Sequence, residues 1–138
     1  MPDAKNRSGS CLCGTVKFSA QSGNSVGVCN CSMCRKWNGG PQMAIYCGDS
    51  VSFENEDSIS VYKSSEWAER GFCKNCGSHL FYRLQGNQHM ILAGLFDNNE
   101  DFVFETQYFI DNKPSFYRFA NETANLTGAE AAEQMGLS

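Results

Sequence analysis

The sequence has no long apolar segment and no concentration of positive charge. No stretch approaches the about 20 consecutive apolar residues that a membrane helix needs, so we expect no membrane-spanning segment. The longest run of basic residues is the pair Arg35-Lys36 and the net charge is −4, which argues against nucleic acid as a partner. The first residues lack the apolar core of a signal peptide, and we therefore expect a cytoplasmic protein.

Proline, internal repeats and low-complexity tracts are also scarce or missing. With only 3 prolines among 138 residues, no proline-rich linker divides the chain. The length suits one domain with a real core, so we expect a single domain over residues 1–138. A hydrophobic fraction of 41% with 19% charged residues excludes a disordered acidic chain.

Short segments rich in Val, Ile, Phe and Tyr recur through the chain and are bounded by Gly, Asn, Asp or Ser. This pattern predicts a mainly β fold of antiparallel sheets joined by short turns. The predicted strands are residues 15–20, 42–47, 51–54, 58–63, 79–84, 89–96 and 106–111.

Helix is sparse in the sequence. A short helix is expected near Ser32, and a second follows Thr127, whose side chain can form a capping box with Glu130. Residues 1–10 are polar and are predicted to form a loose terminus.

The chain has 8 cysteines, and disulfides do not persist in the reducing compartment that we expect. Metal binding or thiol chemistry is therefore the leading explanation, with disulfides as the alternative. Cys47 stands alone and is expected to pack as a small apolar residue. The other seven form three clusters, at Cys11 and Cys13, at Cys29, Cys31 and Cys34, and at Cys73 and Cys76.

The spacing of Cys73 and Cys76, followed by Gly77, is typical of half of a zinc site. A structural zinc ion takes four ligands in a tetrahedron, and Cys11 and Cys13 can supply the other pair. That partition leaves three thiolates at positions 29–34. A zinc ion with three protein ligands keeps one position open for a substrate, so the odd number points to catalysis and to two zinc ions per chain.

Spacing alone leaves alternatives open. A second partition shares one zinc ion among Cys31, Cys34, Cys73 and Cys76. A fourth ligand would close the three-cysteine site and make both zinc ions structural, and the candidates are His79, His89 and Cys47. An iron–sulfur cluster on the three cysteines is a further alternative, although its characteristic spacings differ from this one.

Several motifs together resemble the glutathione-dependent formaldehyde-activating enzyme family, also called the aldehyde-activating or centromere-protein-V-like family. They are "SGSCLCGTVKF", "CNCSMCRKWNG", "SSEWAERGFCKNCGSHLFY", "AGLFDN" and "YFIDNKPSFY", in that order, over about residues 8–118. The succession of CxCG, CxCxxC and WAERGFCxxCGSxLFY is specific. The chain departs from the expected pattern at Phe116, where the resemblance leads us to expect Trp.

The resemblance implies a β-tent fold of antiparallel sheets built around a structural zinc ion. It implies that this ion is held by Cys11, Cys13, Cys73 and Cys76, and that a catalytic zinc ion is held by Cys29, Cys31 and Cys34. It also implies an enzyme that joins glutathione to formaldehyde as S-hydroxymethylglutathione, a carbon–sulfur lyase running in reverse. The expected partners are therefore a small-molecule thiol and an aldehyde.

Charged and aromatic residues beside the clusters are further candidates. Arg35 and Lys36 could steer an anionic thiol, or could be ordinary solvated side chains. Trp67 and Arg70 could line a pocket, or could simply pack. Two other functions stay open at this point: a non-catalytic, zinc-stabilised β module that binds a protein, and metal storage or redox sensing through the open cluster.

Overall fold

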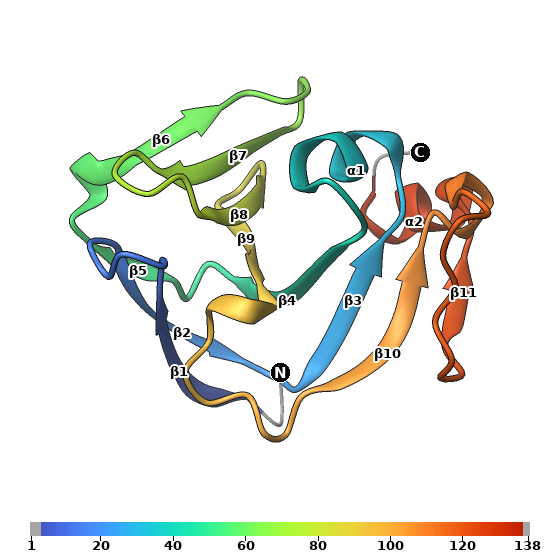
Figure 1. Ribbon diagram of the computed structural model, residues 1–138, viewed down its shortest axis with the longest axis horizontal. Helices are drawn as coiled ribbons and strands as arrows, with labels where there is room; N and C mark the ends of the chain where they lie inside the picture. The colour runs from blue at the N-terminus through green and yellow to red at the C-terminus, as the bar shows by residue number, and fades with distance from the viewer. Residues whose placement is uncertain (1–3, 137–138) are drawn as a thin grey trace. The chain divides into compact units, whose positions relative to one another are not determined.

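The computed structural model describes residues 4–136 and shows a mainly β protein, as the sequence predicts (Figure 1). These residues gather in two compact units, each made from two separate stretches of the chain. Unit 1 comprises the described residues of 1–24 and 44–102, and unit 2 comprises those of 25–43 and 103–138.

Most of the strands belong to unit 1. They are β1 (Lys5–Ser10), β2 (Lys17–Ser22), β5 (Ser52–Glu54), β6 (Ile59–Tyr62), β7 (Ala68–Cys73), β8 (His79–Leu84) and β9 (Gln88–Leu92), with β4 (Gln42–Gly48) joining from Ala44 on. Unit 2 contains β3 (Ser25–Cys29), β10 (Val103–Tyr108), β11 (Ala124–Leu126), α1 (Ser32–Asn38) and α2 (Gly128–Gln134). Single 3₁₀ turns are η1 (Glu56–Ser58), η2 (Ala93–Leu95) and η3 (Ile110–Asn112).

Both α-helices in the described part of the chain have seven residues. None is long and apolar enough to cross a membrane, since a crossing takes about 20 residues.

The strand β1 starts already at Lys5, so the prediction of a loose terminus over residues 1–10 is wrong for the part that is described. Residues 1–3 lie outside the described part. β1 pairs antiparallel with β2, from Lys5 opposite Ser22 to Ser10 opposite Lys17, and β5 pairs on the other side of β2. A side chain at Gly9 would place its Cβ 2.2 Å from the carbonyl oxygen of Leu95, so only glycine fits there.

Arg7 explains why this polar strand is held in place. Its side chain is buried, and its two terminal nitrogens donate to both carboxylate oxygens of Asp101 at 2.7 and 2.9 Å. Its Nε also donates to the Ser22 hydroxyl at 3.2 Å, and the guanidinium lies over the Phe102 ring, 4.9 Å from the centroid. A buried charge is tolerated only when it is paired and hydrogen-bonded, which is the case here.

The larger sheet of unit 1 is antiparallel throughout, in the strand order β4-β9-β8-β7-β6 (Figure 1). The predicted strand over residues 79–84 is confirmed as β8. The one over 89–96 ends at Leu92, where the chain enters η2. Strand β7 was not predicted, although four of its six residues are buried.

The core of unit 1 is formed by fully buried Ile45, Leu80 and Ile91, each of which contributes roughly 1.5–3 kcal/mol by leaving water. The Phe81 ring lies beside Gly71, where a Cβ atom would stand 2.3 Å from it. Phe53 packs on the same ring at 5.4 Å between centroids. The glycine of "ERGFC" thus makes room for an aromatic side chain.

The sheet of unit 2 corrects the expectation of antiparallel pairing. β10 lies between β3 and β11 and is parallel to both. Parallel neighbours need a long connection. Here the chain between β3 and β10 runs through α1 and all of residues 44–102, and 15 residues separate β10 from β11. The aromatic side chains of Phe104 and Phe119 pack edge to face at 4.8 Å.

Both predicted helices are present in unit 2. In α2 the Thr127 hydroxyl accepts from the Glu130 amide at 3.2 Å, and the Glu130 carboxylate accepts from the Thr127 amide at 2.9 Å. The predicted capping box is therefore confirmed. Helix α1 starts at Ser32, as expected, but its N-cap is Cys31.

We predict that the Arg7–Asp101 pair makes the stability of the protein pH-dependent. Hydrogen bonds from Arg7 hold the pKa of Asp101 far below its usual range. A depressed carboxylate pKa contributes stability that is complete above the unfolded pKa of about 4 and is lost as the pH falls towards the folded value. Asp101→Asn should therefore melt about 5 °C or more below wild type at neutral pH, with the gap narrowing between about pH 5 and pH 2.

Thermal melts over this pH range test the prediction. Asp49→Asn removes one exposed carboxylate and serves as the control, with no comparable loss expected. A gap between Asp101→Asn and wild type that stays constant with pH would contradict the assignment.

Candidate metal centres

The three-cysteine cluster of unit 2 lies where β3 passes into α1. Cys29 ends the strand, and Cys31 caps the helix, with its sulfur accepting from the amide of Cys34 at 3.3 Å. Cys34 is the buried residue of the first helical turn. The cap and the turn bring the three sulfurs within 4.8 Å of one another.

The sulfurs of this cluster influence one another's ionisation. Hydrogen bonds from Cys29 and Cys34 lower the pKa of Cys31, whereas the bonds to Cys31 and Cys34, together with burial, raise the pKa of Cys29. One thiolate is thus favoured and the next is opposed by the first negative charge. A cation at the centre would remove that opposition, which is the chemistry expected of a soft metal site.

No fourth His, Cys, Asp or Glu of residues 4–136 joins the three sulfurs. His89 is buried in unit 1, where its Nδ1 lies 3.3 Å from the carbonyl oxygen of Gly48. Cys47 is also buried in unit 1, and burial raises its pKa to about 12, as expected of a cysteine that packs as an apolar residue. Within residues 4–136, the structure therefore assembles a group of three without a fourth His, Cys, Asp or Glu.

The four-cysteine cluster lies in unit 1 and is built from two similar turns. The first follows β1 and ends at Gly14, whose φ is +80° and whose amide donates to Cys11. The second follows β7 and ends at Gly77, also at φ +80°, with its amide donating to Cys73. A positive φ is free of strain only for glycine, so both glycines are needed to turn the sulfurs inward.

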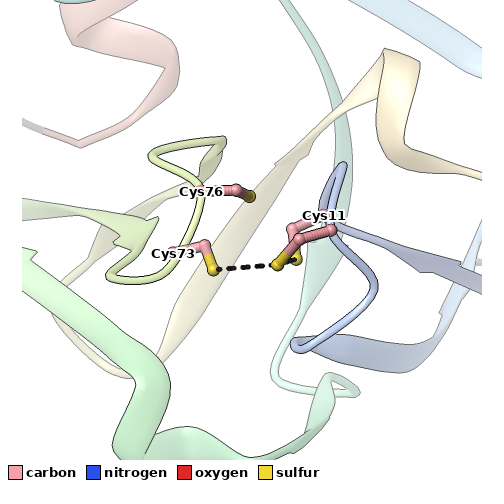
Figure 2. A group of neighbouring side chains, drawn as sticks. Cys11, Cys73 and Cys76 are labelled. Carbon is pink, nitrogen blue, oxygen red and sulfur yellow. Dashed lines mark hydrogen bonds between the residues drawn. The ribbon is translucent and has the colours of Figure 1, made fainter.

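The sulfurs of Cys11, Cys13, Cys73 and Cys76 lie within 4.8 Å of one another. Figure 2 shows three of these side chains, those of Cys11, Cys73 and Cys76, pointing toward a common centre. The grouping matches the partition that combines Cys11 and Cys13 with Cys73 and Cys76. The alternative partition, which combines Cys31 and Cys34 with Cys73 and Cys76, is not found among the groups in residues 4–136. All eight cysteines are free thiols, so disulfides do not explain the clusters.

The sulfur spacing of the four-cysteine cluster fits a tetrahedral zinc ion. With zinc–sulfur bonds of about 2.3 Å, the edges of the tetrahedron are roughly 3.8 Å. The distance from Cys11 Sγ to Cys13 Sγ is 3.6 Å, and that from Cys13 Sγ to Cys73 Sγ is 3.9 Å.

Polar neighbours favour thiolates in this cluster. The pKa of Cys13 is lowered to about 7, mainly by a hydrogen bond with the Thr15 hydroxyl and also by one from the Asn75 side-chain amide. The Ser78 hydroxyl lowers the pKa of Cys76 to about 5. Burial raises the pKa of Cys73, so this sulfur needs a cation to ionise.

In a comparison with known protein families, residues 6–112 match the sequence model of the "glutathione-dependent formaldehyde-activating enzyme" family. The chain belongs to this family. It is also similar to an uncharacterized lyase of Schizosaccharomyces pombe, with 36% identity over 130 residues that cover 92% of this chain and 95% of the relative.

Arg35, which the sequence suggested as a residue that could steer an anionic thiol, is fixed beside the three-cysteine cluster. Its Nε donates to the carbonyl oxygen of Asn30 at 2.9 Å, and its Nη2 donates to that of Asn112 at 3.3 Å. The neighbouring Lys36 is exposed. Arg35 is therefore held to the backbone of unit 2, whereas Lys36 extends into solvent.

The other candidates lie in unit 1. Arg70 is buried, donates to the Ser64 hydroxyl at 3.2 Å and stacks on Tyr82 at 4.8 Å, so packing accounts for it. Trp67 is partly exposed and lines a hollow of about 420 Å³ on unit 1. His79 is half-buried beside the Phe72 ring.

Phe116, the position where Trp was expected, is 79% exposed and packs edge to face with Tyr117 at 5.1 Å. The substitution therefore changes an exposed ring in unit 2 and leaves its core intact.

Sequence reasoning gave no role to Asn30, which lies between Cys29 and Cys31. The side chain is fully buried and hydrogen-bonded on both ends of its amide. One signal was available in the sequence: an amide side chain stands between two cysteines. A residue that only spaced the cysteines and faced solvent would not need a particular side chain.

We predict that the two clusters respond differently to the loss of one sulfur. Cys73→Ser should remove about one metal ion per chain and lower the melting temperature by more than about 10 °C, because this cluster joins turns 60 residues apart. Cys31→Ser should remove about one ion with a smaller loss of stability. Elemental analysis and thermal melts measure both effects.

Cys47→Ala is the matched control, since it removes a buried thiol that belongs to neither cluster, and it should keep the full metal content. Full metal content in Cys31→Ser would show that the three-cysteine cluster does not hold an ion.

Proposed function

We propose that the protein adds a thiol such as glutathione to formaldehyde or another small aldehyde, or catalyses the reverse, as a carbon–sulfur lyase. The observation that carries the proposal is the group of Cys29, Cys31 and Cys34 without a fourth protein ligand among the described residues. The name of the matching family and the lyase name of the relative support this reaction class.

We propose that the protein holds two zinc ions per chain. Cys11, Cys13, Cys73 and Cys76 would form a closed structural site, and Cys29, Cys31 and Cys34 would leave one coordination position for the substrate. A zinc ion held by these three cysteines would supply Lewis acidity and so would lower the pKa of a bound thiol below the ordinary value of about 8.5.

The reaction itself is an addition across a carbonyl group. The sulfur–hydrogen bond of the thiol breaks, a sulfur–carbon bond forms, and the π bond of the aldehyde opens so that its oxygen takes the proton. No oxidant or reductant is consumed. The protein must therefore only deliver a thiolate in the correct orientation and allow a proton to reach the oxygen.

Neighbouring charges of unit 2 suit an anionic thiol. Three thiolates with one divalent cation sum to a net charge of about −1, which favours a nucleophilic sulfur over a strongly acidic metal. Arg35, fixed to the Asn30 and Asn112 carbonyls, offsets this charge beside the cluster. The exposed Lys36 is free to attract a carboxylate of the incoming thiol.

A cytoplasmic location belongs to the same proposal. It is supported by eight free thiols, which persist in a reducing compartment where a glutathione-like thiol is available.

The test follows adduct formation from glutathione and formaldehyde, and from other small thiols and aldehydes. Wild-type protein loaded with zinc should accelerate the addition above the uncatalysed rate. Cys31→Ser should fall to background, because the open site is lost, whereas Cys47→Ala should keep the wild-type rate. NMR of the hydroxymethyl product measures the reaction directly.

Wild-type protein that carries two zinc ions and still gives only the background rate would overturn the proposal. That outcome would leave a zinc-stabilised β module for protein binding. Loss of one zinc ion on mild oxidation, with the fold retained and no catalysis, would instead indicate redox sensing.

A further inference from the structure

We propose that Asn30 is a positioning residue that sets the geometry of the three-cysteine cluster, acting through the hydrogen bonds of its buried side chain. The inference rests on the metal-holding role that the proposed function gives to this cluster. It assigns a role to a residue that is not itself among the candidate metal ligands.

The Asn30 side chain uses both ends of its amide. Its Oδ1 accepts from the Tyr117 hydroxyl at 2.7 Å, and its Nδ2 donates both to Gln107 Oε1 and to the carbonyl oxygen of Tyr108, each at 3.2 Å. The residue is fully buried, and its bond to Gln107 is buried as well. Buried hydrogen bonds of this kind hold a side chain in one orientation.

The backbone of Asn30 is held as well. Its amide donates to the carbonyl oxygen of Tyr108 at 3.0 Å, and its own carbonyl oxygen accepts from Arg35 Nε at 2.9 Å. The peptide groups on both sides of the residue therefore have defined partners. Because Cys29 and Cys31 share these peptide groups, the direction of both sulfurs depends on them.

The partners of the side chain explain why the residue is an amide. Nδ2 faces two acceptors, Gln107 Oε1 and the Tyr108 carbonyl, so an oxygen atom in its place would meet two oxygens. The Gln107 amide cannot turn without cost, since its Nε2 donates to the Thr123 hydroxyl at 3.1 Å. A carboxylate at position 30 would also stand between two thiolate-forming cysteines and repel them.

The network connects the cluster with the rest of unit 2. Gln107 lies on β10, the strand paired with β3, and Thr123 precedes β11. Tyr117 comes from the segment after η3, where Lys113 Nζ lies over its ring at 4.9 Å and also donates to its carbonyl oxygen. Asn30 thus ties the cysteine turn directly to β10 and to the segment after η3, and through Gln107 to Thr123.

Partners of this kind around metal ligands typically contribute 10–100-fold in metal affinity. Two variants test the role of Asn30. Asn30→Asp places a carboxylate against the two acceptors, and Tyr117→Phe removes only the hydroxyl that binds Oδ1. Tyr46→Phe is the matched control, because it also removes a phenol that donates one hydrogen bond, to Gln88, but it belongs to unit 1.

The measurement uses cobalt(II) in place of zinc in the full-length protein. Cobalt bound to four thiolates and cobalt bound to three absorb differently, so one titration reports both sites. We expect Asn30→Asp and Tyr117→Phe to shift the absorption bands of the three-cysteine site and to weaken its cobalt affinity about 10-fold or more. The four-cysteine site, the circular dichroism spectrum and Tyr46→Phe should match wild type.

The inference would be overturned if the three-cysteine site of Tyr117→Phe had the same cobalt spectrum and cobalt affinity as wild type. This holds even if Asn30→Asp fails to fold. Equal disturbance of both sites would also overturn it, since that would indicate a general loss of stability. The readout does not depend on activity, so a wild-type protein without catalysis would refute the proposed function and leave this test intact.

Discussion

Seven cysteine sulfurs stand in two groups, each within 4.8 Å, and thiolates at such separations repel one another unless a cation lies among them. In the three-cysteine group, hydrogen bonds between the sulfurs lower the pKa of Cys31 and, together with burial, raise that of Cys29, so the sulfurs do not all ionise together. A divalent ion among the sulfurs would favour the thiolate form of both residues and so would oppose the rise in the pKa of Cys29. We therefore regard the two turns of unit 1 and the strand-to-helix junction of unit 2 as backbone arranged for metal ions.

The two cysteine groups are built from different local backbone structures, and this difference affects how many sulfurs each group presents. In unit 1 both turns end at a glycine with a positive φ, Gly14 and Gly77, and together they present four sulfurs. In unit 2 the chain runs directly into α1, with Cys31 as its N-cap. The strand end and helix start present three sulfurs from one short segment, and no fourth His, Cys, Asp or Glu of residues 4–136 joins them. We propose that this leaves one coordination position open and that the buried Asn30 holds the geometry of the group.

Much of the fold was predictable because it follows from local patterns. The strand over 79–84 and the capping box of α2 depend on neighbouring residues, and both occur as predicted. β1 was missed because its buried residues are Arg7 and Gly9, which in the sequence resemble a polar terminus. The burial of Arg7 is explained by its partner Asp101, which lies 94 residues further along the chain. The parallel sheet of unit 2 was missed because strand direction depends on the long connections between the strands.

The sequence by itself determined the mainly β class, the short helices and the spacing of the cysteines, since each is a property of residues a few positions apart. The combination of the cysteine clusters, the burial of Arg7 and the surroundings of Asn30 became known from the three-dimensional structure alone. These contacts join positions such as 13 and 73 or 30 and 117, which are 60 and 87 residues apart. Pairing over such distances is decided by the packing of the whole unit, which no local pattern encodes.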